Sequence, residues 1–543
     1  MLEGLLRTKT LEQLRDRAED PGNQLKRRLS AFDLTMLGIG AIVGAGIFST
    51  IGTAAAGNLA DGRLGAGPAL IVSFALTALA CLFTAICYAE LSSMIPVSGS
   101  AYTYAYATLG ELAAWIIGWD LVLEYAVSNV AVAISWGDYA RSFLANIGLN
   151  VPGWLAVDPR SALLVSERGI DALQLDGQPG FGASIDLLAQ AHLGAIDGAS
   201  IFANWDRIKD APMISGCPVT INLLAVVITV TITALCYWGI KESARANAIM
   251  VVLKMALLLA VIALGFRYIT ADNWTPFAPN GFKGIQAGAA IIFFAFIGFD
   301  AVSTTAQECR NPGRDMPRGI LWSLAICAVL YIAVTAVVTG MVSYTELGGK
   351  ADPLAYVFER HGLTGLAGLI SLGAMVATAA CLLVFQIGQP RILMAMSNDG
   401  LLGPWFGKVH PKHGTPGNAT ILTGLVVAVP AALLNIDEVV ELSNIGTLFA
   451  FAIVCVGVMI LRVRRPDAPR GFKVPGAWIV APLGILSCGW LAIGLPSITF
   501  VRFIIWLALG LIVYLIYGAR NSRVREAAAK VIADDGDGPA TTS

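Results

Sequence analysis

The stretch GIGAIVGAGIF, from Gly38 to Phe48, places four glycines within eleven residues of a segment that otherwise has the apolar character of one helix. Glycine has no side chain to restrict its backbone, so each glycine weakens the helix that contains it. Whether these glycines break the helix or only allow close packing depends on the solvent around the segment. The composition of the chain decides that point first.

The chain is far more apolar than an ordinary soluble protein. Its 543 residues are 56% hydrophobic and 13% charged, whereas about a quarter of the residues in a soluble domain are charged. This composition predicts an integral membrane protein. The formal net charge of -1 gives no indication of a nucleic-acid partner. The nine cysteines lie mostly in apolar runs without a CxxC pair, which is typical of small packing residues.

Twelve segments are long and apolar enough to cross a lipid bilayer as helices, which takes about 20 residues each. Their approximate limits are 32–56, 68–95, 112–145, 219–240, 244–268, 285–308, 319–343, 365–395, 418–435, 441–462, 477–497 and 500–518. We therefore predict an all-α protein with about 12 transmembrane helices in the lipid bilayer.

The distribution of Lys and Arg predicts the orientation of these helices. If the N-terminus is cytoplasmic, the short inner loops hold thirteen Lys and Arg residues and the short outer loops hold six. Because cytoplasmic loops carry the excess of positive charge, both the N-terminal segment 1–31 and the polar tail 519–543 are expected in the cytoplasm, with the protein in the plasma membrane. The long outer connection 147–218 is either a small folded cap or a disordered excursion.

Three interpretations of the glycine-rich stretch compete. A dinucleotide-binding fingerprint is excluded, because it needs a preceding strand and an acidic residue about 20 positions later. Close helix packing through Gly40 and Gly44 remains open for part of the stretch. The functional alternative is a discontinuous helix, whose unpaired backbone groups form a ligand site inside a membrane.

A second helix break in a matching position favours the discontinuous helix. The sixth span carries FFAFIGFDAVSTTAQE, in which Gly298 interrupts an apolar run and Asp300 follows two residues later. Spans one to five and six to ten then form two halves with an odd number of helices, which must insert in opposite orientations. This pattern is typical of an inverted repeat with its site between the first and sixth helices.

Five motifs together resemble the amino acid-polyamine-organocation superfamily, and more narrowly the bacterial members of its cationic amino acid transporter family. They are GIGAIVGAGIF, GWDLVLEY, KESARAN, FIGFDAVSTTAQECRNPGRDMPRGI and GQPRILMAMSNDGLL, within a resemblance from about Leu29 to Gly518. The resemblance implies amino acid transport and a LeuT-type five-plus-five inverted repeat with discontinuous helices 1 and 6. The repeats would span 32–268 and 285–462, followed by two further helices in 477–518. The insert 147–218 departs from the family pattern.

A zwitterionic amino acid needs donors for its carboxylate and acceptors for its ammonium group. The half-helix that starts at Gly44, Ala45 and Gly46 offers free N–H groups and the positive end of a helix dipole to the carboxylate. The ammonium group would be bound by carbonyls at Ile42 and in the unwound segment around Gly298. The carbonyls of that segment are those of Phe294, Ala295 and Ile297. Phe296 and Phe299 are candidate gates, with simple packing as the alternative.

Three ionisable side chains lie at membrane depth: Lys254, Glu124 and Asp300. Each is costly in hydrocarbon and must face a partner or a water-filled path. Asp300 is expected to have a structural role, such as capping the inner half of helix six. Glu124 has three possible roles: a structural hydrogen bond, proton coupling, or binding a cationic substrate side chain. The resemblance implies that Lys254 replaces a sodium ion near the first and eighth helices and couples transport to protons, unless it is a permanently charged brace.

No enzyme motif accompanies these features. His410 and His413 lie three residues apart in a loop without a third metal ligand, and the chain has no Walker lysine, HExxH helix or nucleophile elbow. We therefore expect no enzyme, no metal and no cofactor. The sequence predicts a secondary transporter that imports small neutral or varied amino acids with protons. The alternatives are an exchanger, an amine importer or a non-translocating amino acid sensor, whereas a channel is disfavoured because no filter sequence is visible.

Overall fold

The computed structural model of the chain describes residues 8–9, 29–58, 63–97, 99–159, 211–214, 217–238, 243–350, 352–410 and 415–523. Most of the insert 147–218 lies outside the described residues, and so do His413, most of the N-terminal segment and the tail beyond residue 523. The predictions made for those parts are therefore neither confirmed nor contradicted.

The described residues are mostly helical. The helices are α3 (Ala31–Ile42), α4 (Ala45–Ala56), α5 (Leu70–Met94), α6 (Ser100–Thr108), α7 (Glu111–Asn146), α11 (Leu223–Trp238), α12 (Ser243–Gly265), α13 (Gly281–Ile292), α14 (Pro312–Met341), α15 (Pro353–Glu359), α16 (Thr364–Asn398), α17 (Gly417–Leu433), α18 (Ile436–Arg464), α19 (Ala477–Ile493), α20 (Ser497–Val513) and α21 (Ala519–Asn521). Shorter helical turns are η2 (Gly67–Ala69), η3 (Gly153–Leu155), η4 (Phe266–Tyr268), η5 (Ala271–Trp274), η6 (Phe293–Phe296), η7 (Asp300–Glu308), η8 (Tyr344–Leu347) and η9 (Tyr514–Gly518). Within the described ranges, strands occur only as two short antiparallel hairpins, β1 (Gly57–Asn58) with β2 (Arg63–Leu64) and β3 (Met213–Ile214) with β4 (Cys217–Pro218).

Local sequence signals explain where several helices begin. Ser30 and Asp33 form a reciprocal capping box at the start of α3, which satisfies two N–H groups that the first turn leaves free. The helix α14 starts at Pro312, whose fixed φ suits the first helical turn. Asn435 caps α18 by accepting from the backbone N–H of Asp437 at 2.8 Å.

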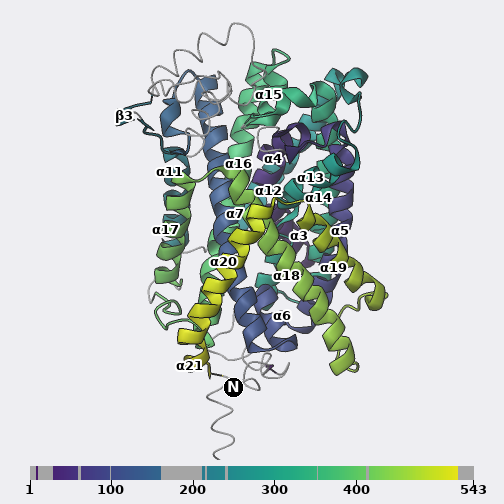
Figure 1. Cartoon of the computed structure of the whole chain (residues 1–543), viewed down its shortest axis with the longest axis vertical. Helices are drawn as coiled ribbons and strands as arrows, with labels where there is room; N and C mark the ends of the chain where they lie inside the picture. The colour runs from purple at the N-terminus through teal and green to yellow at the C-terminus, as the bar shows by residue number, and fades with distance from the viewer. Residues whose placement is uncertain are drawn as a thin grey trace, which may run out of the picture.

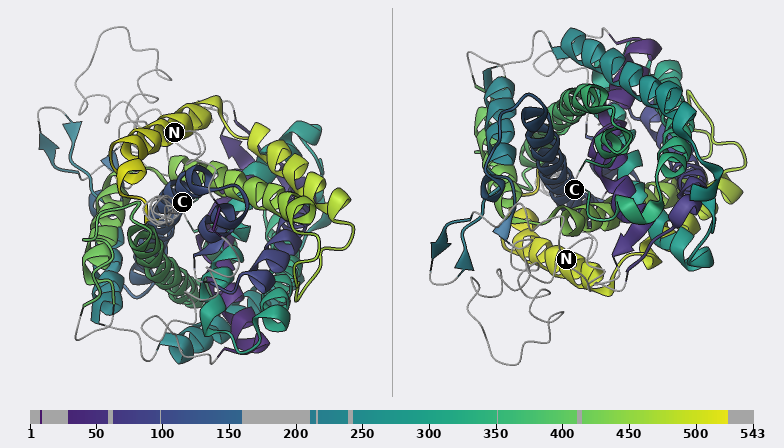
Figure 2. Two further views of the ribbon diagram at one scale, coloured as in Figure 1. Left: turned by 90° about the horizontal axis from the view of Figure 1, so that it is seen from below. Right: turned by 90° about the horizontal axis from the view of Figure 1, so that it is seen from above.

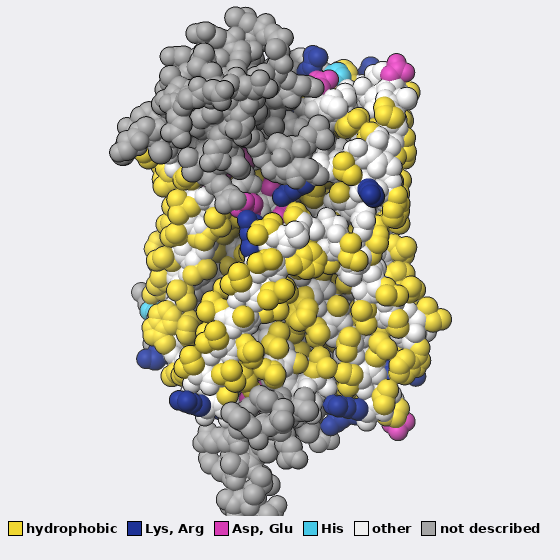
Figure 3. All heavy atoms as spheres, in the orientation of Figure 1, with side chains coloured by type: hydrophobic (Ala, Val, Ile, Leu, Met, Phe, Trp, Pro, Cys, Tyr) yellow, Lys and Arg dark blue, Asp and Glu magenta, His cyan; other side chains and the backbone are white. Residues whose placement is uncertain are grey.

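The helices confirm a multi-pass membrane protein. Eight helices in the described part of the chain are long and apolar enough to cross a membrane, and the bent pair of α3 and α4 makes a ninth candidate. Three shorter apolar helices, α11, α17 and α19, accompany them, and each of the twelve predicted segments overlaps one of these helices. Figure 3 shows hydrophobic side chains covering the middle of the molecule, with Lys and Arg gathered towards its ends.

The spanning helices run along one axis and pack side by side (Figures 1 and 2). The most extensive contacts join α7 with α16 and α5 with α14, and α11 also packs against α17. Each of these pairs joins helices that are five apart in the order of the spans. Two short helices that the sequence did not predict lie towards opposite ends of the molecule (Figure 1). The helix α6 lies towards the same end as α21, and α15 lies towards the other end.

Candidate functional site

The first apolar segment is broken at Val43 and Gly44. The helices α3 and α4 meet there at an angle of 41°. Val43 is extended, with φ of -77° and ψ of 93°, and Gly44 has φ of -146° and ψ of -148°. The break predicted from the glycine-rich stretch is therefore present, and it exposes the last carbonyls of α3 and the first N–H groups of α4 to new partners.

The sixth apolar segment is also broken. The helix α13 continues as η6 to Phe296, Ile297 is extended with ψ of 135°, and η7 begins at Asp300. Between them, Gly298 has φ of 122°, a conformation that side-chain-bearing residues rarely adopt. The interruption predicted at Gly298 is therefore observed.

The two breaks touch each other through their glycines. A Cβ atom on Gly46 would overlap the backbone of Ala295 in η6, and a Cβ on Gly298 would lie 2.8 Å from the carbonyl carbon of Ala41. A Cβ on Gly44 would lie 2.6 Å from the Sγ atom of Cys381 on α16. These glycines are thus required for the close approach of the first and sixth segments, so packing and helix interruption operate together.

Side chains from α12 and α16 bind the last carbonyls of α3. The Nζ atom of Lys254 on α12 donates to the carbonyls of Gly40 at 2.6 Å and Val43 at 2.8 Å. The Sγ atom of Cys381 donates to Ala41 at 3.2 Å. Because the final turn of a helix leaves its carbonyls without intrahelical partners, these contacts tie α12 and α16 to the broken end of α3.

The carbonyl of Ile42 accepts a hydrogen bond from the hydroxyl of Tyr331 on α14, at 2.9 Å. This carbonyl was predicted to bind a substrate ammonium group, and its second lone pair is still available for that purpose. Nothing in the sequence distinguished Tyr331 or Cys381 from their apolar surroundings, since each is a single residue in a hydrophobic run.

The start of α4 has the features expected of an anion site. Its N-cap is Gly44 and no side chain caps its free N–H groups. Ala45 and Gly46, which begin the helix, are both buried. A buried helix start without a capping side chain presents unpaired donors and a positive dipole end.

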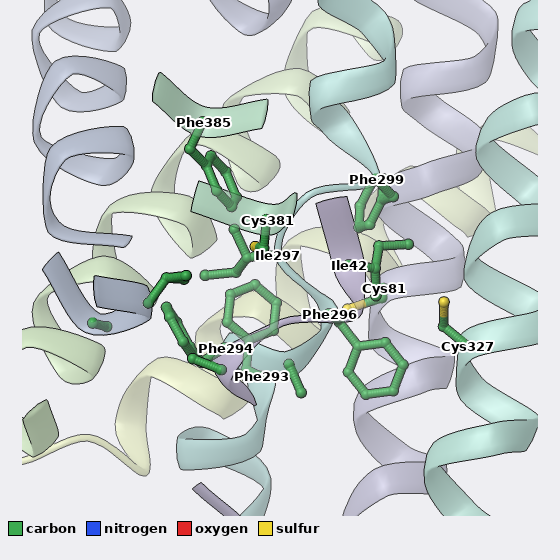
Figure 4. Packing of buried hydrophobic residues seen from close by; sticks show 14 of the residues in the cluster. Ile42, Cys81, Phe293, Phe294, Phe296, Ile297, Phe299, Cys327, Cys381 and Phe385 are labelled. Atoms are coloured by element: carbon green, nitrogen blue, oxygen red, sulfur yellow. The ribbon is translucent and has the colours of Figure 1, made fainter. Parts of the chain in front are cut away.

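The phenylalanines around the second break point in different directions. Figure 4 shows Phe294 and Phe296 on opposite sides of the unwound segment, with Ile297 near Cys381. Phe296 packs against Phe74 and Tyr331, with ring centroids 6.1 and 5.5 Å away.

Phe299 packs against Tyr88 and Phe451, with ring centroids 5.8 and 4.8 Å away. Both candidate gates, Phe296 and Phe299, are fully buried in aromatic clusters. Their packing is thus observed, whereas movement as a gate stays a prediction.

Asp300 lies at the start of η7, next to the second break. Its Oδ1 atom accepts from the backbone N–H of Gly298 at 3.2 Å, a contact within the unwound turn, and its structural role stays a prediction. Its Oδ2 atom has no hydrogen-bond partner among the described residues, and neither does either carboxyl oxygen of Glu124 on α7.

The two candidates for proton coupling lie in separate surroundings. The titratable side chains that interact with Lys254 are those of Cys381 and Cys327, whereas Glu124 faces Asp300 and Asp120. Asp120 is a further buried carboxyl that the sequence interpretation missed, although the motif GWDLVLEY contains it. Within the described residues, no group of three or more His, Cys, Asp or Glu side chains could hold a metal ion.

Known proteins resemble this chain over nearly its whole length. A family model described as amino acid permease matches residues 29–518. A branched-chain amino acid permease of Bacillus subtilis is 42% identical over 503 residues, which cover 92% of this chain and 95% of the relative. A methylthioribose transporter of the same bacterium is 41% identical over 521 residues, covering 96% and 99%. A vacuolar cationic amino acid transporter 4 of Arabidopsis thaliana is 34% identical over 472 residues, covering 86% and 68%.

Proposed function

This chain belongs to the amino acid permease family, within the amino acid-polyamine-organocation superfamily, and on that premise we propose that it imports amino acids across the plasma membrane by proton symport. The family and the relatives are transporters, not enzymes. The observation that carries the proposal is the meeting of two broken helices in a buried region, with an uncapped helix start on one side and a buried lysine on the other.

The proposed architecture is a LeuT-type inverted repeat of 32–268 and 285–462, with two C-terminal helices in 477–518. Two observations support it. The breaks fall in the first helix of each proposed repeat. Helices five apart in order pack against each other, as expected when an internal two-fold axis relates the two halves.

The proposed substrate site lies at the two breaks. The N–H groups at the start of α4, from Gly44 to Gly46, bind the substrate carboxylate, because no side chain occupies that position. The carbonyls of Ile42 and of the unwound segment bind the ammonium group. The carbonyls of that segment belong to Phe294, Ala295 and Ile297, and Gly298 allows the segment to open.

The transporter is proposed to accept amino acids with small neutral side chains, or a broad range of side chains. The side chains near the breaks include Phe294, Ile297, Cys381 and Phe385, all of low polarity (Figure 4). The relatives are named for branched-chain amino acids, methylthioribose and cationic amino acids, so family membership alone does not select one class.

Proton coupling is proposed to act through Lys254. A protonated ammonium group makes two charge-assisted hydrogen bonds to the end of α3, and such bonds are about twice as strong as neutral ones. Loss of the proton weakens this tie and frees α3 to move relative to α12. Substrate binding at the same break biases the same movement, which provides the thermodynamic link between proton and substrate.

The deciding experiment is uptake by the purified protein in proteoliposomes. Twenty amino acids are tested as competitors of labelled leucine, with and without a pH gradient and with and without sodium. We expect accumulation that needs the pH gradient and not sodium. Sodium-dependent accumulation would contradict proton symport, and strict one-for-one exchange would favour the exchanger. A sensor would bind amino acids without repeated turnover.

A further inference from the structure

Three carboxyl groups lie buried together between α7, η7 and α18. Asp120 and Glu124 are one helical turn apart on α7, so they share a face of that helix. Asp300 interacts with Glu124 from η7. The three residues are between 0% and 1% exposed. Gly446 on α18 covers Asp120, because a Cβ at that position would lie 2.7 Å from the Oδ1 atom of Asp120.

Five of the six carboxyl oxygens in this cluster meet no donor at ordinary hydrogen-bond distance and angle among the described residues, although the Thr447 hydroxyl of α18 interacts with Glu124. They are both oxygens of Asp120, both oxygens of Glu124 and the Oδ2 atom of Asp300. The hydroxyl groups of Tyr88 and Tyr125 also lack hydrogen-bond partners, whereas those of Tyr104 and Ser303 interact with each other. Tyr88 and Tyr125 interact with both Glu124 and Asp300, and Tyr104 interacts with Asp300.

No cation of the described chain faces this cluster. The groups that act on Glu124 are Asp300, Asp120 and the Thr447 hydroxyl of α18. Besides Glu124, backbone N–H groups of its own turn act on Asp300, and no cation acts on Asp120. Lys254 interacts with none of the three.

Two other buried carboxylates in the described chain are matched with cations. Glu90 pairs with Arg462 and Arg470, at 2.6 and 3.0 Å. Asp315 pairs with Arg314 at 2.8 Å. The absence of a cation therefore distinguishes the cluster from the ion pairs that hold the rest of the fold together.

A buried carboxylate without a cation is costly, whereas a protonated carboxyl is neutral and can share its proton with a neighbour. We propose that Asp120, Glu124 and Asp300 form a second proton-binding centre, separate from Lys254, that holds protons while the structure is closed and releases them when water enters. This inference rests on the proposed proton symport and adds a further coupled proton to it.

The step is a simple acid dissociation. When water reaches the cluster, the O–H bond of a carboxylic acid breaks, the proton passes to water and a solvated carboxylate remains. Closure reverses the step. Asp120 lies nine residues from the start of α7 at Glu111, about 13 Å at 1.5 Å per residue. Asp120 is also one turn nearer that end than Glu124. From the helix break towards the end of the molecule that carries α6, the order of the three groups is therefore Asp300, Glu124 and Asp120.

Infrared spectroscopy of the purified protein tests the protonation without any transport. Protonated carboxylic acids absorb in a carbonyl-stretch region where carboxylates do not, and the band moves on exchange into D₂O. We expect such a band at neutral pH, and we expect Glu124→Gln, Asp120→Asn and Asp300→Asn each to weaken it. The control Asp315→Asn removes a buried but ion-paired carboxylate and should leave the band unchanged. A band that none of the three cluster variants alters would overturn the proposal.

Accumulation in proteoliposomes tests the coupling. A pH difference of one unit is worth about 1.4 kcal/mol per proton, or about tenfold in the equilibrium accumulation ratio. Loss of one coupled proton in Glu124→Gln should therefore lower leucine accumulation about tenfold per pH unit. Because this ratio is an equilibrium quantity, a slower variant still reports it. Asp120→Asn provides the second measurement if Glu124→Gln does not reach equilibrium.

The outcomes separate this inference from the proposed function. If the wild-type protein accumulates no amino acid under a pH gradient, the proposed symport is wrong, while the infrared band still reports the protonation. If the wild type accumulates leucine and Glu124→Gln and Asp120→Asn reach the same ratio, the second centre is not coupled and the inference is wrong. If Glu124→Gln loses only lysine uptake and keeps the leucine ratio, the carboxyl groups bind a cationic substrate instead.

Discussion

Gly298 and Gly46 show how single residues define the proposed site. Gly298 adopts a φ of 122° and lies against Ala41, while Gly46 lies against the backbone of Ala295. Neither position has room for a side chain. Both glycines could be selected from the sequence because they interrupt apolar runs in corresponding halves of the chain, where a helix in lipid has no other reason to be weakened.

Substitution of Gly46 by leucine should abolish substrate binding. The new side chain would overlap Ala295 and separate the two breaks, so the donors at the start of α4 and the carbonyls of the unwound segment would no longer face one substrate. Binding is measured as the shift in the unfolding temperature with leucine. Gly489→Leu is the matched control, because a Cβ at Gly489 meets no atom within 4 Å. Wild-type affinity in Gly46→Leu would show that the glycine serves packing alone.

Substitution of Lys254 by glutamine should remove the share of pH-driven accumulation that the lysine proton carries, about tenfold per pH unit, and leave only the share carried by the carboxyl cluster. Glutamine keeps donors for the carbonyls of Gly40 and Val43 but carries no exchangeable charge, so the protein should remain folded. Accumulation of leucine is compared with and without a pH gradient in proteoliposomes. Lys283→Gln, which changes an exposed lysine at the start of α13, should behave as wild type. Normal pH dependence in Lys254→Gln would move the proton site elsewhere.

Tyr331, Cys381 and Asp120 mark the limit of prediction at this scale. A single tyrosine or cysteine in an apolar helix has the same sequence signature whether it packs or donates to a distant carbonyl. Asp120 did carry a signal, because a carboxyl at membrane depth is costly and it lies one turn from Glu124. Its significance follows only from the absence of a cation nearby, which depends on tertiary packing.

At the scale of elements, hydrophobicity located the apolar helices well. Each of the twelve predicted segments overlaps a helix, because a bilayer demands long apolar runs. The short helices α6 and α15 were missed, since SAYTYAYAT and PLAYVFE are too short and too mixed in polarity to resemble a span. Which helices pack together depends on the three-dimensional arrangement, which the apolar pattern of one helix does not report.

The end of α5 is held to α18 by an ion-pair cluster whose loss should destabilise the protein. Glu90 is 1% exposed and accepts from Arg462, Arg470 and the backbone N–H of Val474. Glu90→Gln leaves two arginines without their counter-charge, and we expect a loss of about 3–5 kcal/mol in the free energy of unfolding. Thermal unfolding in detergent measures the change.

The control for Glu90 is Glu438→Gln. Glu438 pairs with Arg502 at 3.4 Å near the surface, with 23% of its side chain exposed. Such a pair is worth about 0–1 kcal/mol, so the unfolding temperature should change little. Equal shifts for the two variants would mean that burial of the Glu90 cluster adds no stability.

At the scale of the whole molecule, both terminal segments meet at one place. The Nζ atom of Lys9 lies 2.7 Å from the carboxylate of Asp399, and the backbone N–H of Arg523 donates to the carbonyl of Asp399 at 3.1 Å. Ser522 donates to Glu111 at the start of α7. The chain therefore starts and ends its membrane passage at the same end, as an even number of crossings requires.

The Lys and Arg distribution predicts that this shared end faces the cytoplasm. Arg464, at the end of α18, donates to the carbonyl of Thr108 in α6, so Arg465 and Lys473 belong to the same end. Arg360 follows α15, with 60% of its side chain exposed, at the opposite end (Figure 1). Each of these three positions is changed to cysteine in a cysteine-free background and exposed to an impermeant thiol reagent on intact cells. We expect labelling at 360 and none at 465 or 473, and labelling at all three after permeabilisation. Labelling at 465 in intact cells would reverse the topology. The end that carries α6, towards which the carboxyl cluster is proposed to release its protons, would then face the outside.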